Sequence, residues 1–361
     1  MNIYFDLPQL YYLPQYLPVW WELQSQNIDG TFLFYHDPDM AEVMQTVILR
    51  ENLPVKWVAN SVEAADIYRT DQPDWVIFGN GFPDLHRIPD TTKTAMLYHG
   101  AGVKACYFDE ELMATDVRFV EGVYRYQKLS AMYPNAVIHD VGFAKLDPLF
   151  MPDRRQKFQF NLDQHGLDSS KSTLLYAPTF YPSSIELMAD DWPARFSEYN
   201  LIVKPHFFTL SKKKYRNQQK KIGKWERYNN TYIARPDDYS LLPFMAVSDL
   251  LISEASSAFF EFAALDKPVV WCDFMKLRMG YRGIFKFRYA KRMDADIQAY
   301  HDIGIHVDRY SRLKQAVDSQ ITNPDQFKAN RRRYTGELIG ETDGKTSKRI
   351  VDYLLAGAYD Q

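Results

Sequence analysis

The sequence has little of what several large classes of protein require. Its 361 residues include only two cysteines, Cys106 and Cys272, which excludes a disulfide framework and fits a reducing compartment. No apolar run approaches the ~20 residues of a membrane span, and the first ten residues do not have the basic and apolar regions of a signal peptide. We therefore expect a soluble, cytoplasmic protein, one that could still touch the inner face of a membrane.

Common ligand-binding motifs are also missing. The chain has no GxxxxGK[ST] loop and no GxGxxG after a predicted strand, which argues against a Walker site and weakens a dinucleotide-binding interpretation. The two cysteines stand alone and no His/Cys group has ligand spacing, so we expect neither a metal nor a cofactor. A formal net charge of -3 argues against a general nucleic-acid binder.

What the chain does have is a regular alternation of short apolar strands and helices. Strands are predicted at residues 2–5, 31–35, 56–59, 75–78, 94–98, 118–120 and 136–141. After a charged connection, strands are predicted again at residues 173–176, 200–204, 231–234, 250–252 and 269–271. A helix is expected from about residue 185, and the last helices at 311–317, 323–333 and 347–355. Alternation at this spacing predicts an α/β fold with parallel sheets.

The charged connection near residue 150 divides the chain into two similar halves. We expect an N-terminal Rossmann-like domain over 1–150, a nucleotide-donor domain over 151–335, and a C-terminal helix within 336–361 that could pack back on the first domain. A basic cluster between Lys212 and Lys224 is either a solvated surface or a contact for an anionic membrane.

Functional groups in such sheets collect on the loops after the strands. Two of the eight histidines, His99 and His206, end predicted strands in different halves, which favours a shared cleft. Imidazole can take a proton at neutral pH and, when protonated, donates hydrogen bonds to phosphate. The neighbouring Gly100 and Gly102 would let the backbone approach an acceptor, or would simply permit the turn.

A strand–turn–helix–strand unit follows Asp249, and its turn contains Ser256 and Ser257. The start of a helix offers free N–H groups and a favourable dipole for anions, so these serines could bind a phosphate. They could equally serve only as helix caps. Both interpretations remain open from this stretch alone.

Five segments of the chain share a characteristic order. Tyr98–Lys104 follows a WHGxPxK pattern, Ala177–Tyr181 an APTxR pattern, and Lys204–Phe207 a basic-Pro-His-Pro pattern. Asp249–Ser257 then follows D-x-L-I-T-D-Y-S-S. Phe260–Pro268 follows F-[DE]-x-A-x-x-x-K-P. Together they resemble the CDP-glycerol glycerophosphotransferase family, the teichoic-acid primases and polymerases, over roughly residues 95–275. The sequence departs from these patterns at Tyr98, Gly102, Tyr181, Phe207 and Glu254–Ala255, which leaves the donor headgroup open.

The resemblance implies the GT-B architecture, two Rossmann-like domains facing a cleft. It also implies transfer of glycerol phosphate from CDP-glycerol, or a related nucleotide donor, to a hydroxyl of a glycan or lipid-linked acceptor, with release of CMP. His99 would be the general base and His206 would stabilise the transferring group. The acceptor side would comprise Gly100, Gly102 and Lys104. The donor would be held by Thr179, Lys204, Ser256 and Ser257, with Asp238 or Glu261 at the cytidine or ribose.

Three other functions stay open. A GT-B glycosyltransferase using a UDP- or CMP-sugar would have a similar phosphate site, because fold does not determine function. A non-catalytic protein that binds a nucleotide-linked precursor would need no base at His99. A nucleotide-sugar epimerase is less favoured, because no carboxylate pair is placed for it. The adjacent carboxylates Asp190–Asp191 and Asp237–Asp238 are interpreted as a turn and a strand-end loop and not as a metal pair.

Overall fold

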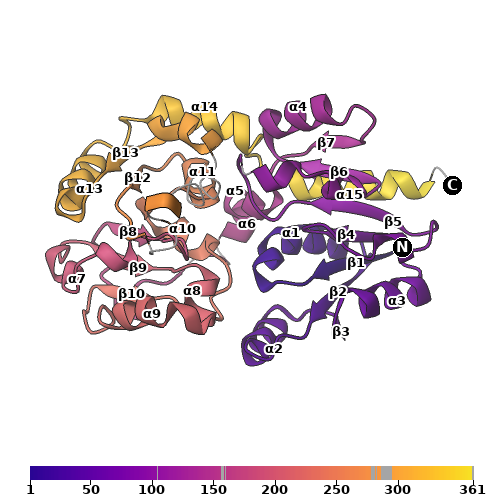
Figure 1. Cartoon of the computed structure of the whole chain (residues 1–361), viewed down its shortest axis with the longest axis horizontal. Helices are drawn as coiled ribbons and strands as arrows, with labels where there is room; N and C mark the ends of the chain where they lie inside the picture. The colour runs from indigo at the N-terminus through magenta and orange to yellow at the C-terminus, as the bar shows by residue number, and fades with distance from the viewer. Residues whose placement is uncertain are drawn as a thin grey trace. The chain divides into compact units, whose positions relative to one another are not determined.

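The computed structural model describes residues 1–103, 105–155, 158, 160–277, 281, 283–285 and 295–359. Contacts divide the chain into two compact units, each with its own parallel sheet (Figure 1). The first comprises Met1–Ala101, Ala105–Pro152 and the chain from Gly336 on. The second comprises Asp153–Thr335 together with Gly102 and Val103. Lys104, one of the acceptor-side residues named above, lies outside the described residues.

The first unit is built on a seven-stranded sheet in the order β3-β2-β1-β4-β5-β6-β7. Its strands are β1 (Asn2–Leu7), β2 (Asp29–Tyr35), β3 (Val55–Val58), β4 (Trp75–Phe78), β5 (Lys93–Leu97), β6 (Val117–Val120) and β7 (Ile138–Asp140). Its helices are α1 (Leu13–Ser25), α2 (Ala41–Glu51), α3 (Ser61–Asp71), α4 (Gly122–Met132), α5 (Asp147–Phe150) and α15 (Thr346–Tyr359). Every residue of β4 and β6 is buried, as expected where helices cover both faces of a parallel sheet.

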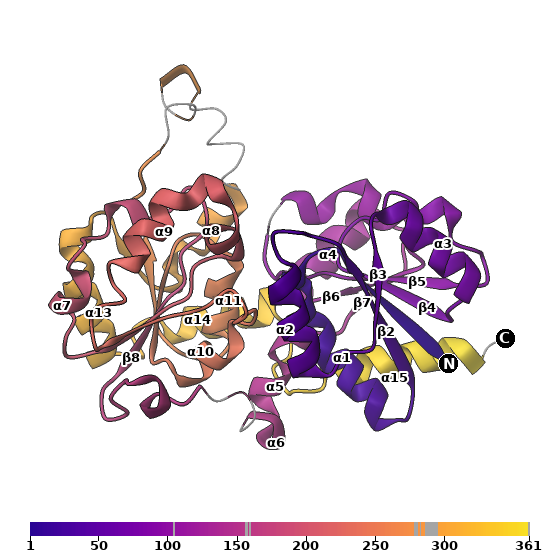
Figure 2. The same ribbon diagram turned by 90° about the horizontal axis from the view of Figure 1, so that it is seen from below.

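The C-terminal helix α15 belongs to this first unit and packs against α1 (Figure 2). The indole nitrogen of Trp75 donates a 3.1 Å hydrogen bond to the carbonyl of Leu354. At the other end of the helix, the buried carboxylate of Asp147 accepts from the backbone N–H groups of Thr346 at 3.2 Å and Ser347 at 2.6 Å. These bonds satisfy helix N–H groups that have no partner within the helix itself.

The second unit is built on a six-stranded sheet in the order β10-β9-β8-β11-β12-β13. Its strands are β8 (Thr173–Tyr176), β9 (Asn200–Val203), β10 (Thr231–Ile233), β11 (Leu250–Ser253), β12 (Val269–Cys272) and β13 (Ile305–Val307). Its helices are α7 (Trp192–Arg195), α8 (Phe207–Ser211), α9 (Arg216–Gly223), α10 (Leu242–Val247), α11 (Ser257–Ala263) and α13 (Leu313–Thr322). Two further α-helices, α6 (Pro152–Arg155) and α14 (Lys328–Leu338), each include residues of both units.

The structure of the second unit differs from the prediction at two places. The helix expected from residue 185 is only a 3₁₀ turn, Ile185–Leu187, followed by the single turn of α7. This segment is held instead by burial of Met188 and Trp192 in the core, and Pro193 restricts where a helix can begin. Strand β13 was not predicted, because its sequence, Ile-His-Val, is not a continuous apolar run.

The basic cluster falls on α9 and on the 3₁₀ turn Lys213–Tyr215 before it, with Lys212 and Lys224 on either side. Lys213, Lys214 and Lys220 are exposed, whereas Lys224 forms an ion pair of 2.6 Å with Asp190. In the described part of the chain, no helix combines the length and the apolar character needed to cross a membrane.

Candidate functional site

His99 follows β5 at the carboxyl edge of the first sheet, where its ring is half-buried. Its Nδ1 lies 2.8 Å from the carbonyl oxygen of Gly79, which follows the neighbouring strand β4. A carbonyl oxygen can only accept, so Nδ1 carries the proton. In the neutral ring Nε2 then holds the lone pair, which is the state that a general base needs.

Aromatic rings surround this imidazole. The ring of Tyr12 is stacked on it, with centroids 4.4 Å apart and planes 21° apart. Tyr11 and Tyr107 meet it edge-on, with centroids at 5.3 Å and 6.0 Å. Sequence reasoning missed Tyr12 and Gly79, since they lie 87 and 20 positions from His99 and only the fold brings them to it.

The glycine loop after His99 is required by packing. A Cβ on Gly100 would lie 2.3 Å from the hydroxyl of Tyr107. The Gly100 carbonyl also accepts a 3.2 Å hydrogen bond from Arg125, which is buried and forms an ion pair of 2.8 Å with Glu121. Gly100 therefore lets the chain pass close to a buried charged pair.

Gly102 adopts a φ of +111°, a conformation that side chains rarely allow. The family pattern has proline at this position, and proline is restricted to φ near −65°. The loop backbone at Gly102 therefore cannot be the one that a proline would impose. This departure changes the shape of the loop that was expected to approach an acceptor.

In the second unit, Glu254, which follows β11, forms hydrogen bonds to the loop after β8 at the carboxyl edge of the sheet. Its buried carboxylate accepts from the backbone N–H groups of Thr179 and Ser184, both at 2.6 Å. It also accepts from the hydroxyl of Ser184 and, at 3.3 Å, from that of Ser183. Burial raises the pKa of Glu254, and these hydrogen bonds act in the opposite direction. The sequence showed Glu254 only as a departure from the family's aspartate; its role in joining two loops appears in the structure.

The side chain of Thr179 forms a hydrogen bond within the loop after β8. Its hydroxyl donates a 2.6 Å hydrogen bond to the carbonyl of Pro182. A hydroxyl has one proton, so in this arrangement Thr179 has none left to donate to a phosphate. Ser253 likewise donates to the Ala177 carbonyl at 2.6 Å, which ties β11 to the loop after β8.

His206 follows β9 and occupies the N-cap position of α8. Its Nδ1 accepts a 3.1 Å hydrogen bond from the backbone N–H of Phe208. The neutral ring therefore carries its proton on Nε2, the opposite tautomer from that of His99. His206 can thus donate to a phosphate in its neutral form, whereas the sequence predicts donation by the protonated ring. Lys204, two residues earlier, is buried with 8% exposure.

Ser256 lies at the N-cap position of α11 with extended backbone angles. Its side chain makes no capping hydrogen bond to that helix, so the interpretation of Ser256 as a hydrogen-bonding cap is wrong. Its hydroxyl lies 3.3 Å from that of Ser253. Ser257, the first residue of α11, is half-buried. Because α11 has only seven residues, hydroxyl groups matter more here than a helix dipole.

The two carboxylates expected near the nucleoside differ in their surroundings. Asp238 closes the turn after β10, where it accepts from the backbone N–H of Arg235 at 2.7 Å and the hydroxyl of Tyr232 at 2.9 Å. Glu261 is buried within α11, with 1% exposure, rather than lying on a solvated first turn.

The order of strands in the second sheet explains which candidate residues lie close together. Strands β10, β9, β8 and β11 are neighbours, so the loops that carry Asp238, His206, Thr179 and Ser256 lie along one edge of the second sheet. His99 and Gly100 belong to the first unit. That His99 and Ser256 meet across one crevice stays a prediction.

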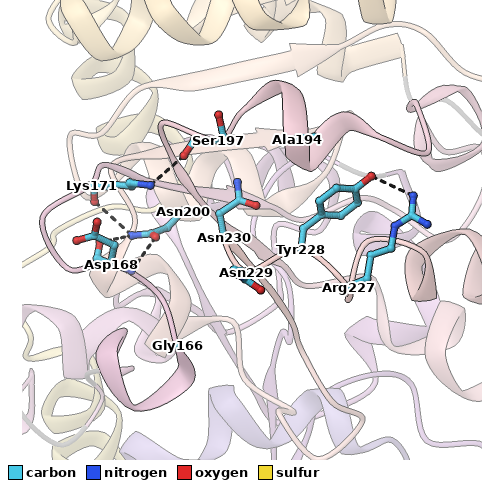
Figure 3. Close-up of a pocket in the computed structure, with 10 residues that line it drawn as sticks. All are labelled: Gly166, Asp168, Lys171, Ala194, Ser197, Asn200, Arg227, Tyr228, Asn229 and Asn230. Carbon is cyan, nitrogen blue, oxygen red and sulfur yellow. Dashed lines mark hydrogen bonds between the residues drawn. The ribbon is translucent and has the colours of Figure 1, made fainter.

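A pocket of about 480 Å³ opens at the opposite edge of the second sheet, where β8 to β10 begin (Figure 3). Its amides are engaged in holding loops. Asn200 donates to the carbonyls of Asp168 and Lys171, and Asn230 donates to three carbonyls at 3.1 Å. Because the pocket lies at the amino ends of the strands and its buried polar groups are satisfied, we do not assign the donor to it. Among the described residues, no three His, Cys, Asp or Glu side chains are grouped to hold a metal ion.

The chain resembles a curated protein in sequence. The sequence is 25% identical over 198 residues to the teichoic acid glycerol-phosphate primase of Bacillus spizizenii, which is 53% of this chain and 45% of the primase. The chain thus spans about half the length of the curated relative it matches.

Solved structures share the fold. A structure of the wall teichoic acid polymerase TagF gives a TM-score of 0.68 at 15% identity, covering 100% of this chain and 89% of that one. The UDP-GlcNAc 2-epimerase of Neisseria meningitidis, solved with UDP-GlcNAc, gives 0.64 at 14% identity, covering 99% and 100%. These likenesses confirm the α/β fold with two parallel sheets, of the GT-B type.

The sequence model of one family covers nearly three quarters of the chain. It matches residues 92–356, which include His99 and every donor-side candidate. The resemblance found in the loop motifs is therefore confirmed, and the chain belongs to the CDP-Glycerol:Poly(glycerophosphate) glycerophosphotransferase family.

Proposed function

We propose that the protein transfers glycerol phosphate from CDP-glycerol to a hydroxyl of a cell-surface glycan or lipid-linked acceptor. The acceptor oxygen forms a bond to the phosphorus that carries glycerol. The bond from that phosphorus to the bridging oxygen of the diphosphate breaks, and CMP leaves with the electron pair. The hydroxyl proton passes to Nε2 of His99.

The observation that carries this proposal is the geometry of His99 within the family-matched segment. The carbonyl of Gly79 holds Nδ1–H at 2.8 Å, so Nε2 is the nitrogen suited to accept a proton. The matched family is named for transfer from CDP-glycerol, and a TagF variant has been solved after soaking with CDPG. TagF has also been solved with one histidine replaced by asparagine and another by alanine.

The donor-side residues fit the chemistry of a diphosphate. Nε2–H of His206 and the hydroxyl of Ser257 are neutral donors, and Lys204 adds a positive charge. Ser253 gives its proton to Ala177, so the Ser256 hydroxyl donates to Ser253 in this structure and would have to rotate to reach a phosphate. Donors of this kind stabilise the charge that develops on the equatorial and leaving oxygens during phosphoryl transfer. Glu254 supports them by binding Thr179 and Ser184 of the loop after β8, and Ser253 ties the same loop to β11.

The test is CMP release by the purified chain with CDP-glycerol and lipid-linked or oligosaccharide acceptors. His99→Gln removes the base and is expected to lower kcat by about 10² to 10⁴. The matched control is His139→Gln, in the edge strand β7, where the ring packs on Tyr353 and should not affect turnover. Near-normal CMP release by His99→Gln would exclude His99 as the base.

A screen of donors separates the remaining functions. Release of CMP from CDP-glycerol, with no turnover of UDP- or CMP-sugars, supports the transferase. Turnover of a nucleotide sugar instead would show a glycosyltransferase. Tight binding of CDP-glycerol without turnover on any acceptor, and with no loss on changing His99, would show a binding protein.

Access to a lipid-linked acceptor would bring the protein to a membrane surface. We assign that contact to the exposed lysines of the basic cluster, Lys213, Lys214 and Lys220, since each is worth about 1 kcal/mol near anionic lipid. Co-sedimentation with anionic vesicles should fall when all three become glutamine. Equal co-sedimentation of this variant and the wild type would exclude the assignment.

A further inference from the structure

The surroundings of His99 come largely from a part of the chain outside the family match. That match begins at residue 92, so the first 91 residues lie outside it. Within them, Gly79 provides the carbonyl that binds Nδ1, Tyr12 the ring stacked on the imidazole, and Tyr11 an edge contact. The nitrogen that accepts the proton is thus selected by residues outside the matched segment.

We infer that Tyr12 and the Gly79 carbonyl form a support that holds Nε2 of His99 as the proton-accepting nitrogen and stabilises the ring once it is protonated. This inference rests on the proposed function. Tyr12 and Gly79 are positioning residues, because they act through His99 and not on the substrate.

The support is itself fixed by the first sheet. Tyr12 ends the 3₁₀ helix Leu10–Tyr12, which follows β1, and its side chain is 3% exposed. Tyr16 on α1 donates a 3.0 Å hydrogen bond to the carbonyl of Asp6. A Cβ on Gly79 would lie 2.8 Å from the Tyr16 hydroxyl and 2.9 Å from the Tyr12 ring. Only glycine lets this carbonyl reach His99 beside both tyrosines.

Two interactions favour the protonated ring. A carbonyl that accepts from Nδ1–H binds the imidazolium more strongly than the neutral ring. A ring centroid at 4.4 Å lies within the range in which an aromatic face attracts a cation. Both therefore act when the acceptor loses its proton, and they also hold the ring in one orientation.

Other groups near the imidazole bear on its protonation. Tyr11 and Tyr107 contact it edge-on, from the segment after β1 and from the 3₁₀ helix Ala105–Phe108. The charged groups near the rings that contact His99 include Asp6 and Arg125. The charge of Asp6 adds to the effect of burial in raising the pKa of Tyr12, and the Arg125 guanidinium lies 4.4 Å from the Tyr107 ring centroid. The ion pair of Arg125 with Glu121 offsets the repulsion that Arg125 would exert.

The test is nitrogen-15 NMR of the histidine rings across a pH titration, in the full chain. The wild type should show His99 with its neutral proton on Nδ1. Tyr12→Phe keeps the ring and should leave this unchanged. Tyr12→Leu removes the ring and should lower the protonation midpoint of His99 by about one pH unit relative to Tyr12→Phe. The acid limb of kcat should move with it, with about tenfold lower kcat and an unchanged donor KM.

A neutral His99 protonated on Nε2 in the wild type would overturn the inference, even if Tyr12→Leu fails to fold. Identical titrations of Tyr12→Leu and Tyr12→Phe would also overturn it. The spectra do not depend on turnover. If the tautomer and the midpoints are as expected but no acceptor gives CMP release, the proposed function is refuted and the support of His99 stands. If CMP is released but the neutral ring carries its proton on Nε2, the proposed function stands and the support is refuted.

Discussion

Replacing Asp6 with asparagine should make the protein progressively more stable than the wild type as the pH rises from mild acid to neutrality. Asp6 lies near the end of β1 and is 4% exposed. One carboxylate oxygen accepts from the hydroxyls of Tyr35 and Tyr68, both at 2.8 Å. Burial raises the pKa of Asp6 from 3.8 to about 6, and the two hydrogen bonds offset only part of this effect.

The sign follows from where the proton is held more tightly. The pKa is higher in the folded protein, so the stabilising contribution of this group is complete below 3.8 and is lost as the pH rises through about 6. A difference of about two pKa units corresponds to about 3 kcal/mol in the free energy of unfolding. About 2 kcal/mol of it should disappear between about pH 4.5 and pH 8, since part is already lost at the lower pH.

Urea unfolding of the wild type and Asp6→Asn across this range measures the difference. Asparagine can still accept from both tyrosines, so packing is preserved. The control is Asp71→Asn in the same unit. Burial raises the pKa of Asp71, but its bonds to Lys56 and Tyr4 outweigh that and lower the pKa, so the Asp71→Asn difference should stay flat above pH 4.5. Parallel curves for Asp6→Asn and the wild type, or a carbon-13 titration of Asp6 near 4, would refute the reasoning.

Two further predictions concern packing at the candidate loops. Glu254→Ala leaves the buried N–H groups of Thr179 and Ser184 without their acceptor and should cost about 3 to 5 kcal/mol in urea unfolding, with Glu254→Gln costing less; equal losses would contradict the hydrogen-bond account. Gly100→Ala should destabilise by about 1 to 3 kcal/mol because its Cβ meets the Tyr107 hydroxyl, whereas Gly336→Ala, with nothing within 4 Å, should gain up to about 1 kcal/mol. Similar melting temperatures for the two alanine variants would show that the clash is relieved at little cost.

Strand positions followed from local sequence because buried parallel strands are short apolar runs between polar turns. Residues 173–176 and 75–78 were predicted with the bounds that the structure has. The helix expected from residue 185 failed because its chain is held by bonds from Ser183 and Ser184 to Glu254, 70 residues away or more. Contacts at that separation leave no periodic pattern in a local stretch.

One other motif residue, Lys267, binds backbone carbonyls. Lys267, in the family's Lys-Pro element, donates to the carbonyls of Met245, Ala246 and Ser248 at 2.6 to 3.0 Å. It therefore satisfies carbonyls at the end of α10. This motif residue thus stabilises the chain that leads into β11, at the end of the strand opposite Ser256.

The sequence by itself determined the α/β class, the two sheets and the loops on which His99, His206 and Ser256 lie, because strand length, turn residues and motif order are local properties. The tertiary structure alone decided which ring nitrogen of each histidine holds a proton, that Thr179 has no hydrogen left to donate, and that Glu254 joins two loops. For His99 and Glu254 the partners, Gly79 and Ser184, come within reach only when strands far apart in the chain become neighbours in a sheet. For His206 and Thr179 the partners, Phe208 and Pro182, are two and three positions away, and the turn of the backbone after the strand sets the bond.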